Sequence, residues 1–286
     1  MKKIFVVLVF FLFQALPSIS FGQNHHKHDS LTHKQIKKLK REEFRKSNER
    51  YFFKFGAVNA RLNTEVEFDL VDDLLTAKVG LEDNLGLPEK SAFFTASFIH
   101  RFTPASGIYV NYYGINRAEN HVTERDIIFQ SDTIPAGTAS RAYFNTQVVS
   151  TGYLLSLKQD PNAFLGAYFN LYLMWLKTGV NSDIKNIDAE VSYAAPLPNF
   201  GIVAMFKLTN WLHLDGNVGF FSLKVNDFDG TLFDFNVRLN FKPTKWFGLS
   251  VSYQEFDIRV GFPYESIYTT VDYNFRGPAF GVNVSF

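Results

Sequence analysis

From residue 51 to residue 286, polar and apolar side chains alternate with a period of two, in segments separated by turn residues. Successive side chains of a strand point to opposite faces of the sheet. Residues 232–242 show this most clearly, with Phe233, Phe235, Val237, Leu239 and Phe241 on one face and Asp234, Asn236, Arg238 and Asn240 on the other. No segment of this part shows a sustained helical stripe. The alternation therefore predicts an all-β protein.

The polar face of these segments is rich in Asn, Gly, Tyr and Ser, whereas the water-exposed face of a soluble sheet is usually rich in Lys, Glu and Thr. Small polar groups suit a narrow enclosed lumen, and a continuous apolar face suits contact with lipid. We therefore expect a closed antiparallel transmembrane β-barrel in which the apolar residues of 233–241 face lipid. Its interior should hold a polar network of Asp215, Asn217, Asp234, Asn236, Arg238, Asn240, Asp272 and Arg276.

Turn signals set the number of strands. Four short turns occur at residues 101–109, 157–164, 206–212 and 241–247. Long polar connections are expected between them on the extracellular side, at residues 64–90, 119–140, 178–189, 226–231 and 260–265. This order predicts ten strands, with twelve as the alternative. Strands near 106–130 and 138–158 exceed the ~10 residues that a bilayer requires, so they should project beyond the membrane.

The last segment, residues 271–286, changes its alternation at Gly277-Pro278. Val271, Tyr273 and Phe275 occupy odd positions, whereas the apolar residues from Phe280 to Phe286 occupy even ones. One extra residue in a strand reverses the parity, so a β-bulge is expected here, with both sets facing lipid. The terminal Phe286 fits a strand that is delivered to the barrel-assembly machinery.

The N-terminal residues predict export. Lys2 and Lys3 precede an apolar run, and small residues precede Gln23, which is typical of a signal peptide over residues 1–22. Residues 23–50 form a His-rich basic tail, expected to be solvated in the periplasm and to contain a short helix within 31–49; contact with anionic inner-leaflet headgroups is the alternative. Residues 51–286 are then the barrel. The absence of Cys excludes disulfides and Cys-ligated metals.

Several strings together resemble a family of Gram-negative, Bacteroidota-like outer-membrane β-barrel proteins that has no assigned biochemical activity. They are LEDNLGL at 81–87, TIPAGT at 133–138, APLPNFG at 195–201, DFDG at 227–230 and YNFRGPAFGVNVSF at 273–286. The resemblance implies an outer-membrane location and a barrel fold, and it supplies no catalytic residues.

Three functions follow as hypotheses. The first is a structural or surface-binding barrel whose enclosed charges form a plug, with outer-membrane lipids and lipopolysaccharide as its partners. The second is a narrow channel for ions or small solutes. The third is an enzyme that modifies the acyl chains of lipid A or phospholipids, for which His121, with Ser131, Ser140 or Asp126, is the only histidine expected on the extracellular side. No cofactor or metal site is expected, and the net charge of +1 predicts no nucleic-acid partner.

Overall fold

The computed structural model describes residues 35–36, 39, 42, 50–70, 75–124, 126–129, 132–160, 162–182, 187–225, 227–264 and 267–286. The chain divides into two compact units, Met1–Lys40 and Arg41–Phe286. Residues Gln35, Ile36 and Leu39 of the first unit are helical, and so is Glu42 of the second. The predicted signal peptide and most of the His-rich tail lie outside the described residues.

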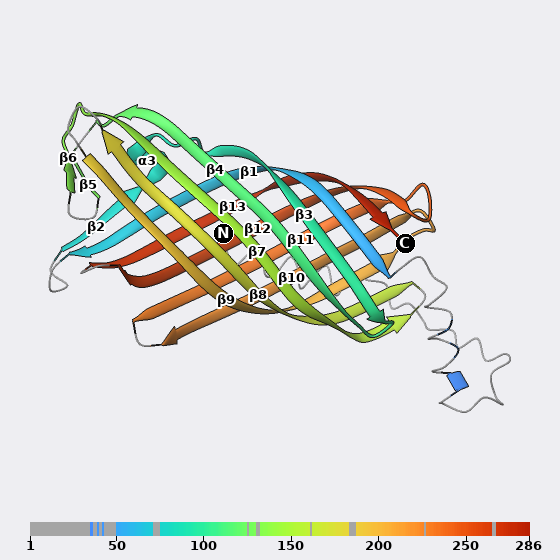
Figure 1. The fold of residues 1–286 in the computed structure, drawn as a ribbon. Helices are drawn as coiled ribbons and strands as arrows, with labels where there is room; N and C mark the ends of the chain where they lie inside the picture. Colours follow the sequence, from blue (N-terminus) through green and yellow to red (C-terminus); the bar gives the residue numbers. More distant parts are fainter. Residues whose placement is uncertain are drawn as a thin grey trace, which may run out of the picture. The chain divides into compact units, whose positions relative to one another are not determined.

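Ten long antiparallel strands form a closed barrel, which confirms the predicted fold class and the count of ten (Figure 1). The order around the barrel is β1-β3-β4-β7-β8-β9-β10-β11-β12-β13, and pairing of β13 with β1 closes it. The strands are β1 (Tyr51–Leu70), β3 (Lys90–Thr103), β4 (Ser106–Val122), β7 (Ala139–Asp160), β8 (Ala163–Ser182), β9 (Ile187–Lys207), β10 (Leu212–Val225), β11 (Phe228–Phe241), β12 (Phe247–Tyr264) and β13 (Ile267–Ser285).

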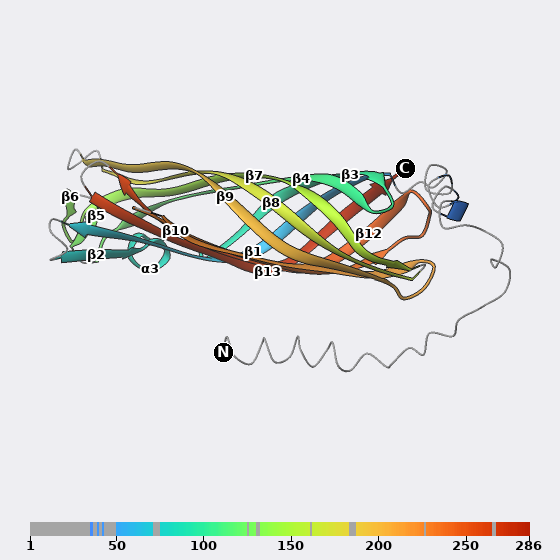
Figure 2. The ribbon, with the colours of Figure 1, turned by 90° about the horizontal axis from the view of Figure 1, so that it is seen from below.

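Four smaller elements complete the barrel. Strand β2 (Leu75–Gly80) pairs with one end of β1 and is followed by the short helix α3 (Leu81–Leu85). Strands β5 (Ile127–Phe129) and β6 (Asp132–Ile134) pair only with each other. All four gather at one end of the barrel, which we call the hairpin end, and the C-terminus lies at the other, the turn end (Figure 2).

The predicted turns are confirmed at one end of the barrel, and three of the predicted loops are wrong at the other. The four short turns predicted from the sequence are present at the turn end, for example between Thr103 and Ser106 and between Phe241 and Phe247. The long loops predicted at 178–189, 226–231 and 260–265 are wrong, because strands occupy most of those residues. β8 extends to Ser182, and β9 begins at Ile187. Several polar residues taken for loops are instead strand positions: Asp229 and Thr231 lie on the outer face, whereas Thr178 and Ser182 are buried on the inner face.

The bulge predicted at Gly277-Pro278 is also wrong. Strand β13 pairs with β12 in one unbroken register from Ile267 to Val284, through both of these residues. The register irregularities that do occur lie beside the short turns, between Arg101 and Thr103 and between Ser156 and Lys158. On β13, therefore, odd-numbered side chains point into the barrel along the whole strand.

What changes along each strand is the polarity of its two faces. On the outer face of β12, Leu249, Val251 and Tyr253 are followed by Glu255, Asp257 and Arg259. On the inner face, the order is reversed: Ser250, Ser252 and Gln254 come first, and Phe256, Ile258 and Val260 follow. The barrel thus has a turn half with an apolar outer face and a polar interior, and a hairpin half with a polar outer face and an apolar interior.

Candidate functional site: the interior and the outer face

The turn half encloses a hydrogen-bonded carboxylate. Asp234 on β11 is 8% exposed and accepts hydrogen bonds from three strands. Tyr168 Oη of β8 donates to Asp234 Oδ2 at 3.2 Å, Asn217 Nδ2 of β10 donates to the same oxygen at 2.5 Å, and Asn199 of β9 donates to Oδ1. A buried carboxylate needs such partners, because an unpaired charge in a low-dielectric interior is costly.

Gly219 of β10 makes room for this cluster. Its register partners are Asp234 on β11 and Gly201 on β9. A Cβ at Gly219 would lie 2.6 Å from Nδ2 of Asn199, and closer still to Tyr168 Oη and Asp234 Oδ1. The side chains of three strands can converge only because this position carries none.

A second cluster lies nearer the turn end, around Asp215 of β10. Arg238 Nη1 of β11 lies 3.4 Å from Asp215 Oδ2, and Lys54 Nζ of β1 lies 4.0 Å from the same oxygen. Asn240 donates to Oδ1 of Asp215 and accepts a hydrogen bond of 2.9 Å from Asn283 of β13. Lys54 and Arg238 therefore place two cations beside the Asp215 carboxylate in the turn half of the interior.

The structure places most of the predicted network inside the barrel but corrects two of its members. Asp215, Asn217, Asp234, Asn236, Arg238 and Asn240 lie on the inner face, and Phe233, Phe235, Val237, Leu239 and Phe241 lie on the outer face. Asp272 and Arg276 lie on the outer face, contrary to the prediction. Their assignment to the interior assumed a bulge, and β13 keeps one register, so its even-numbered residues all point outward. Lys54 and Tyr168, which the sequence analysis did not name, take part in the interior clusters instead.

Aromatic and aliphatic side chains fill the hairpin half of the interior. Rings from strands that do not pair meet across the barrel: the centroids of Tyr113 and Phe256 are 5.8 Å apart, and those of Phe144 and Tyr273 are 5.4 Å apart. Phe129 on β5 packs edge-on against Phe68 of β1 at 5.0 Å, so the β5-β6 hairpin folds inward over this core. We call it the plug; its most buried large side chains include Phe68, Phe129, Phe144, Leu197, Leu232, Ile258, Phe262 and Tyr273.

A buried ion pair lies beside the plug, where the neighbour of β1 changes from β3 to β2. Strand β3 begins at Lys90, and beyond it β1 pairs with β2 while β4 continues to Val122. Helix α3 fills the interval, and its Glu82 forms an ion pair with Arg117 of β4, with side chains 5% and 1% exposed. Glu82 Oε2 also accepts a hydrogen bond of 2.8 Å from the backbone N–H of Thr64. Arg117 Nη2 donates a hydrogen bond of 2.6 Å to Thr64 Oγ1.

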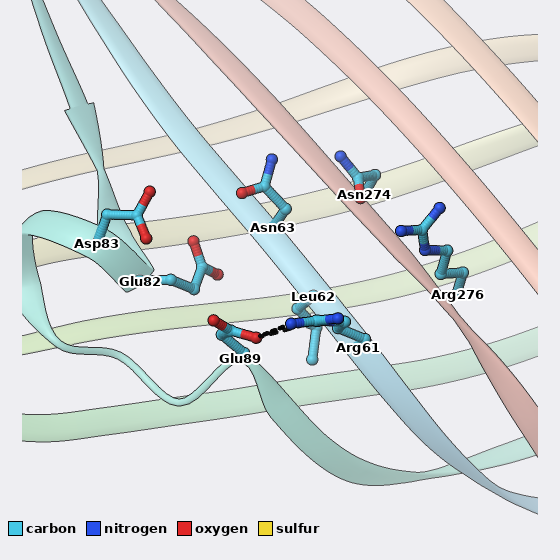
Figure 3. A pocket seen from close by; sticks show the side chains of 8 residues that line it. All are labelled: Arg61, Leu62, Asn63, Glu82, Asp83, Glu89, Asn274 and Arg276. Carbon is cyan, nitrogen blue, oxygen red and sulfur yellow. Dashed lines mark hydrogen bonds and ion pairs between the residues drawn. The ribbon is translucent and has the colours of Figure 1, made fainter. Parts of the chain in front are cut away.

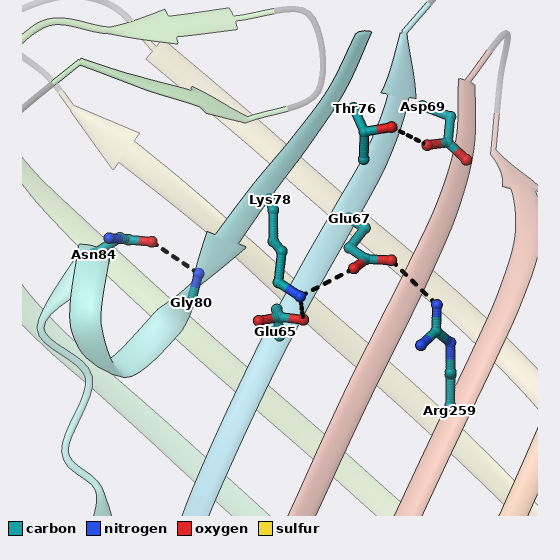
Figure 4. Close-up of polar contacts among 8 residues, drawn as sticks. All are labelled: Glu65, Glu67, Asp69, Thr76, Lys78, Gly80, Asn84 and Arg259. Carbon is teal, nitrogen blue, oxygen red and sulfur yellow. Dashed lines mark hydrogen bonds and ion pairs between the residues drawn. The ribbon is translucent and has the colours of Figure 1, made fainter. Parts of the chain in front are cut away.

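The outer face of the hairpin half carries paired charges. Lys78 of β2 contacts Glu65 and Glu67 of β1, and Arg259 Nη2 of β12 lies 3.3 Å from Glu67 Oε2 (Figure 4). The hydrogen bond to Glu65, followed by that to Glu67, raises the pKa of Lys78 above its ordinary value. Burial raises the pKa of Asp272 on β13, with a further contribution from the Asp257 carboxylate.

A cavity of about 180 Å³ opens beside this region, at the junction of α3, β1 and β13 (Figure 3). Within it, Arg61 donates to Glu89 Oε2 from Nε at 3.0 Å and from Nη2 at 2.6 Å. The lining residues are Arg61, Leu62, Asn63, Glu82, Asp83, Glu89, Asn274 and Arg276. Among the described residues, no group of three or more His, Asp or Glu side chains could hold a metal ion.

The groups proposed for an enzyme do not converge. Ser140 Oγ donates to the backbone carbonyl of His121 at 3.4 Å, and Asp126 Oδ1 accepts from the backbone N–H of Ala136 at 2.8 Å. In the part of the chain that the structure describes, neither contacts the His121 imidazole through a hydrogen bond, and Ser131 lies outside that part. Among the described residues, His121, Ser140 and Asp126 therefore do not form the mutually hydrogen-bonded set that a nucleophile, a base and an orienting group require.

Comparison with known proteins supports the barrel fold. No family model matches the chain, and no curated protein matches it. The chain is similar to the outer-membrane protease OmpT from Escherichia coli, with a TM-score of 0.52 and 10% identity over 83% of this chain and 97% of that one. It also matches the attachment invasion locus protein Ail of Yersinia pestis, with a TM-score of 0.34 and 10% identity over 81% of this chain and 99% of that one.

A further match is the transport unit of the autotransporter AIDA-I from Escherichia coli, with a TM-score of 0.39 and 9% identity over 83% of this chain and 90% of that one. Of these three, the first has a TM-score above 0.5. It shows that this chain shares the β-barrel fold of that protein, and its low identity carries no activity to this chain. No helix among the described residues is long and apolar enough to cross a membrane.

Proposed function

We propose that this protein is an integral outer-membrane β-barrel, closed to solutes, that serves a structural or surface-binding role. Two features of the turn half support its position in a membrane. On β13 the outer face is apolar from Pro278 to Phe286, a length of roughly 20 Å across a membrane for a strand tilted by about 40°. Exposed aromatic side chains flank this apolar band, as in other membrane barrels.

All three tryptophans lie at the edges of the apolar band. Trp211 and Trp246 are in turns at the turn end, and Trp175 is the last apolar outer-face residue of β8 before Lys177. Each is about half exposed. Indole rings concentrate at membrane interfaces because they are apolar but carry a polar N–H group. The hairpin end then lies outside the cell, and outer-membrane lipids, lipopolysaccharide and the barrel-assembly machinery are the proposed partners.

The plug is the single observation that carries the closed state. Large side chains from opposite walls are in contact across the hairpin half, and the buried Arg117–Glu82 pair holds α3 against them. Ions cross poorly where polar groups and water are replaced by packed apolar side chains. The charged clusters of the turn half do not by themselves make a path, because they end below the plug.

Conductance in planar bilayers tests the closed state. The wild-type protein should give no current steps, and Arg238→Ala should leave the bilayer equally silent. A triple variant that replaces Tyr113, Phe256 and Phe275 with alanine removes rings that are in mutual contact and should produce steps if it still folds. Steps from the wild-type protein that change with Arg238→Ala would instead establish the channel alternative.

Labelling on whole cells tests the membrane position. The chain contains no cysteine, so a single introduced cysteine is the only thiol. A membrane-impermeant maleimide should label Lys78→Cys, at the hairpin end, on intact cells, and it should label Thr244→Cys, in a short turn, only after the outer membrane is opened. Equal labelling of both variants, or of neither before lysis, would contradict the proposed orientation.

A further inference from the structure

Three cationic residues lie side by side on the outer face of adjacent strands. Register pairs place Lys90 of β3 opposite Arg61 of β1, and Arg61 opposite Arg276 of β13. All three are exposed. Neighbouring strands are about 4.8 Å apart, so the three Cα atoms fall within roughly 10 Å. We call these residues the basic row.

The basic row differs from the rest of this face in how its charges are compensated. Toward the hairpin end, the cations of the adjoining strands β2 and β12 meet acids: Lys78 contacts Glu65 and Glu67, and Arg259 contacts Glu67 (Figure 4). Within the basic row, only Arg61 has an acidic partner, Glu89. Among the described residues, Lys90 and Arg276 form no ion pair, although Glu255 is the register partner of Arg276 on β12.

Like charges directly opposite one another destabilise a sheet unless a counterion neutralises them. Such an alignment therefore points to a bound anion. The free donors are suitable: Arg276 offers its whole guanidinium fork, Arg61 retains Nη1, and Lys90 adds an ammonium group. Asn63 and Asn274, one outer-face position nearer the hairpin end, line the adjoining cavity and add amide donors (Figure 3).

The position of the basic row relative to the apolar band identifies the anion. On β1 the outer face is apolar up to Ala57, and Arg61 stands two outer-face positions beyond it. On β13, Arg276 is the first outer-face residue beyond Pro278, where the apolar band ends. If the apolar band spans the hydrocarbon, the basic row lies at the level of the lipid headgroups.

We propose that the basic row binds the phosphate groups of a phosphorylated glycolipid of the outer leaflet. The proposal rests on the membrane position proposed above. Guanidinium groups bind phosphate oxygens through two parallel hydrogen bonds, and a lysine at the same height adds a point charge. The lipid is thereby held against the β1-β13 junction, where the barrel closes, and its sugars can reach Asn63 and Asn274.

Lipid titration of the purified full-length protein in non-ionic detergent tests this site. Native mass spectrometry counts bound lipid A carrying both phosphates and, in parallel, lipid A from which the phosphates have been removed. Each Lys or Arg near a membrane surface contributes about a five-fold change in binding. Arg276→Gln should therefore weaken binding of the phosphorylated lipid about five-fold. The triple variant Lys90→Gln, Arg61→Gln and Arg276→Gln should weaken it on the order of a hundredfold.

A matched variant controls for net charge. Lys78→Gln, Arg259→Gln and Lys224→Gln remove three cations from the same outer face away from the basic row, and this variant should bind like the wild type. The proposal is overturned if the two triple variants lose the same affinity, if lipid A without phosphates binds as well, or if millimolar inorganic phosphate displaces the lipid completely. The last result would assign the row to a soluble phosphate.

Two further readouts separate this proposal from the proposed function. Electrophoretic mobility of heated and unheated samples shows whether each variant remains a folded barrel. Whole-cell labelling of Lys78→Cys reports the membrane position independently of lipid binding. If labelling supports the membrane position and the basic-row variant still binds phosphorylated lipid A normally, the lipid site alone is refuted.

Discussion

The barrel strands run from the turn half toward the hairpin half, where β2 takes the place of β3 beside β1 and the pairing of β9 with β10 ends at Phe200 and Phe220, and the polarities of the two halves are opposite. On β1, Phe53 and Phe55 point outward and Lys54 inward, whereas farther along Glu65 and Glu67 point outward and Val66 and Phe68 inward. Odd-numbered side chains point outward and even-numbered ones inward along the whole of β1, so the strand alternation does not set the polarity. Under the proposed membrane position, the medium outside each half sets it: lipid around the turn half and water around the hairpin half.

This difference separates two ways of stabilising one sheet. In water, a barrel gains stability by burying apolar groups inside, as the plug does. In lipid, apolar burial inside offers little advantage over contact with lipid, so the interior can hold polar groups if they satisfy one another. Substitutions of the same chemistry should therefore have opposite consequences in the two halves.

Removal of Arg117 should have the largest effect. Arg117→Met leaves the Glu82 carboxylate buried without its partner and should lower the free energy of unfolding by about 3–5 kcal/mol. Adding Glu82→Gln removes that charge but keeps an oxygen that can accept from the Thr64 N–H, so the double variant should recover much of the loss. Urea titrations in detergent measure both. A double variant as unstable as the single one would show that the hairpin half does not behave as a water-surrounded core.

An arginine placed on the outer face of β11 compares the halves on one strand. Phe235→Arg should cost about 2–4 kcal/mol if Phe235 lies near the bilayer midplane. Thr231→Arg, four residues nearer the hairpin end on the same face, should change stability by less than about 0.5 kcal/mol. Asn236→Ser, on the inner face, should be mild. The free energy of unfolding in lipid bilayers is the appropriate measurement. An equal loss of stability from Thr231→Arg and Phe235→Arg would show that the outer face has no boundary between lipid and water between these residues.

The period-two pattern was sufficient to predict the strands, the four short turns and the closed barrel, because alternation and turn chemistry are local properties. It was not sufficient to place Asp272 and Arg276. The change of parity between Phe275 and Phe280 has two explanations, a bulge or a change of surrounding medium, and a single strand does not distinguish them. The same change occurs on β1 and β12, and a shared change of medium explains all three without a bulge in each.

The predicted lengths of the loops at the hairpin end were wrong for a related reason. Residues 178–189 and 226–231 are rich in Asn, Asp, Gly, Ser and Thr, a composition that is typical of loops and does not show where a strand ends. The interior clusters could be predicted only in part. Lys54 and Tyr168 reach Asp215 and Asp234 across the barrel from β1 and β8, and such contacts between distant strands depend on the closed geometry.

A smaller effect is expected from the glycine that admits the Asp234 cluster. Gly219→Ala places a methyl group against Asn199, Tyr168 and Asp234 and should cost about 1–3 kcal/mol through displaced side chains. Gly80→Ala, in the hairpin half, meets no atom closer than 3.7 Å and should be nearly neutral. Thermal unfolding followed by gel mobility compares them. If Gly219→Ala is neutral too, the interior of the turn half is more loosely packed than the structure shows.

The smallest effect should come from acid on the outer face of the hairpin half. Hydrogen bonds from Lys177 and then Tyr143 lower the pKa of Glu190 below its ordinary value of 4.5. A carboxyl group with a lowered pKa in the folded state stabilises the protein above the unfolded-state pKa and loses this contribution as the pH falls through the folded-state pKa. Wild type should therefore be slightly more stable than Glu190→Gln at pH 7, and the two should converge as the pH falls through the folded-state pKa. A difference in the free energy of unfolding between wild type and Glu190→Gln that stays constant as the pH falls would show that Glu190 is not protonated from water. The outer face of the hairpin half would then not be the water-exposed surface that the comparison of the two halves requires.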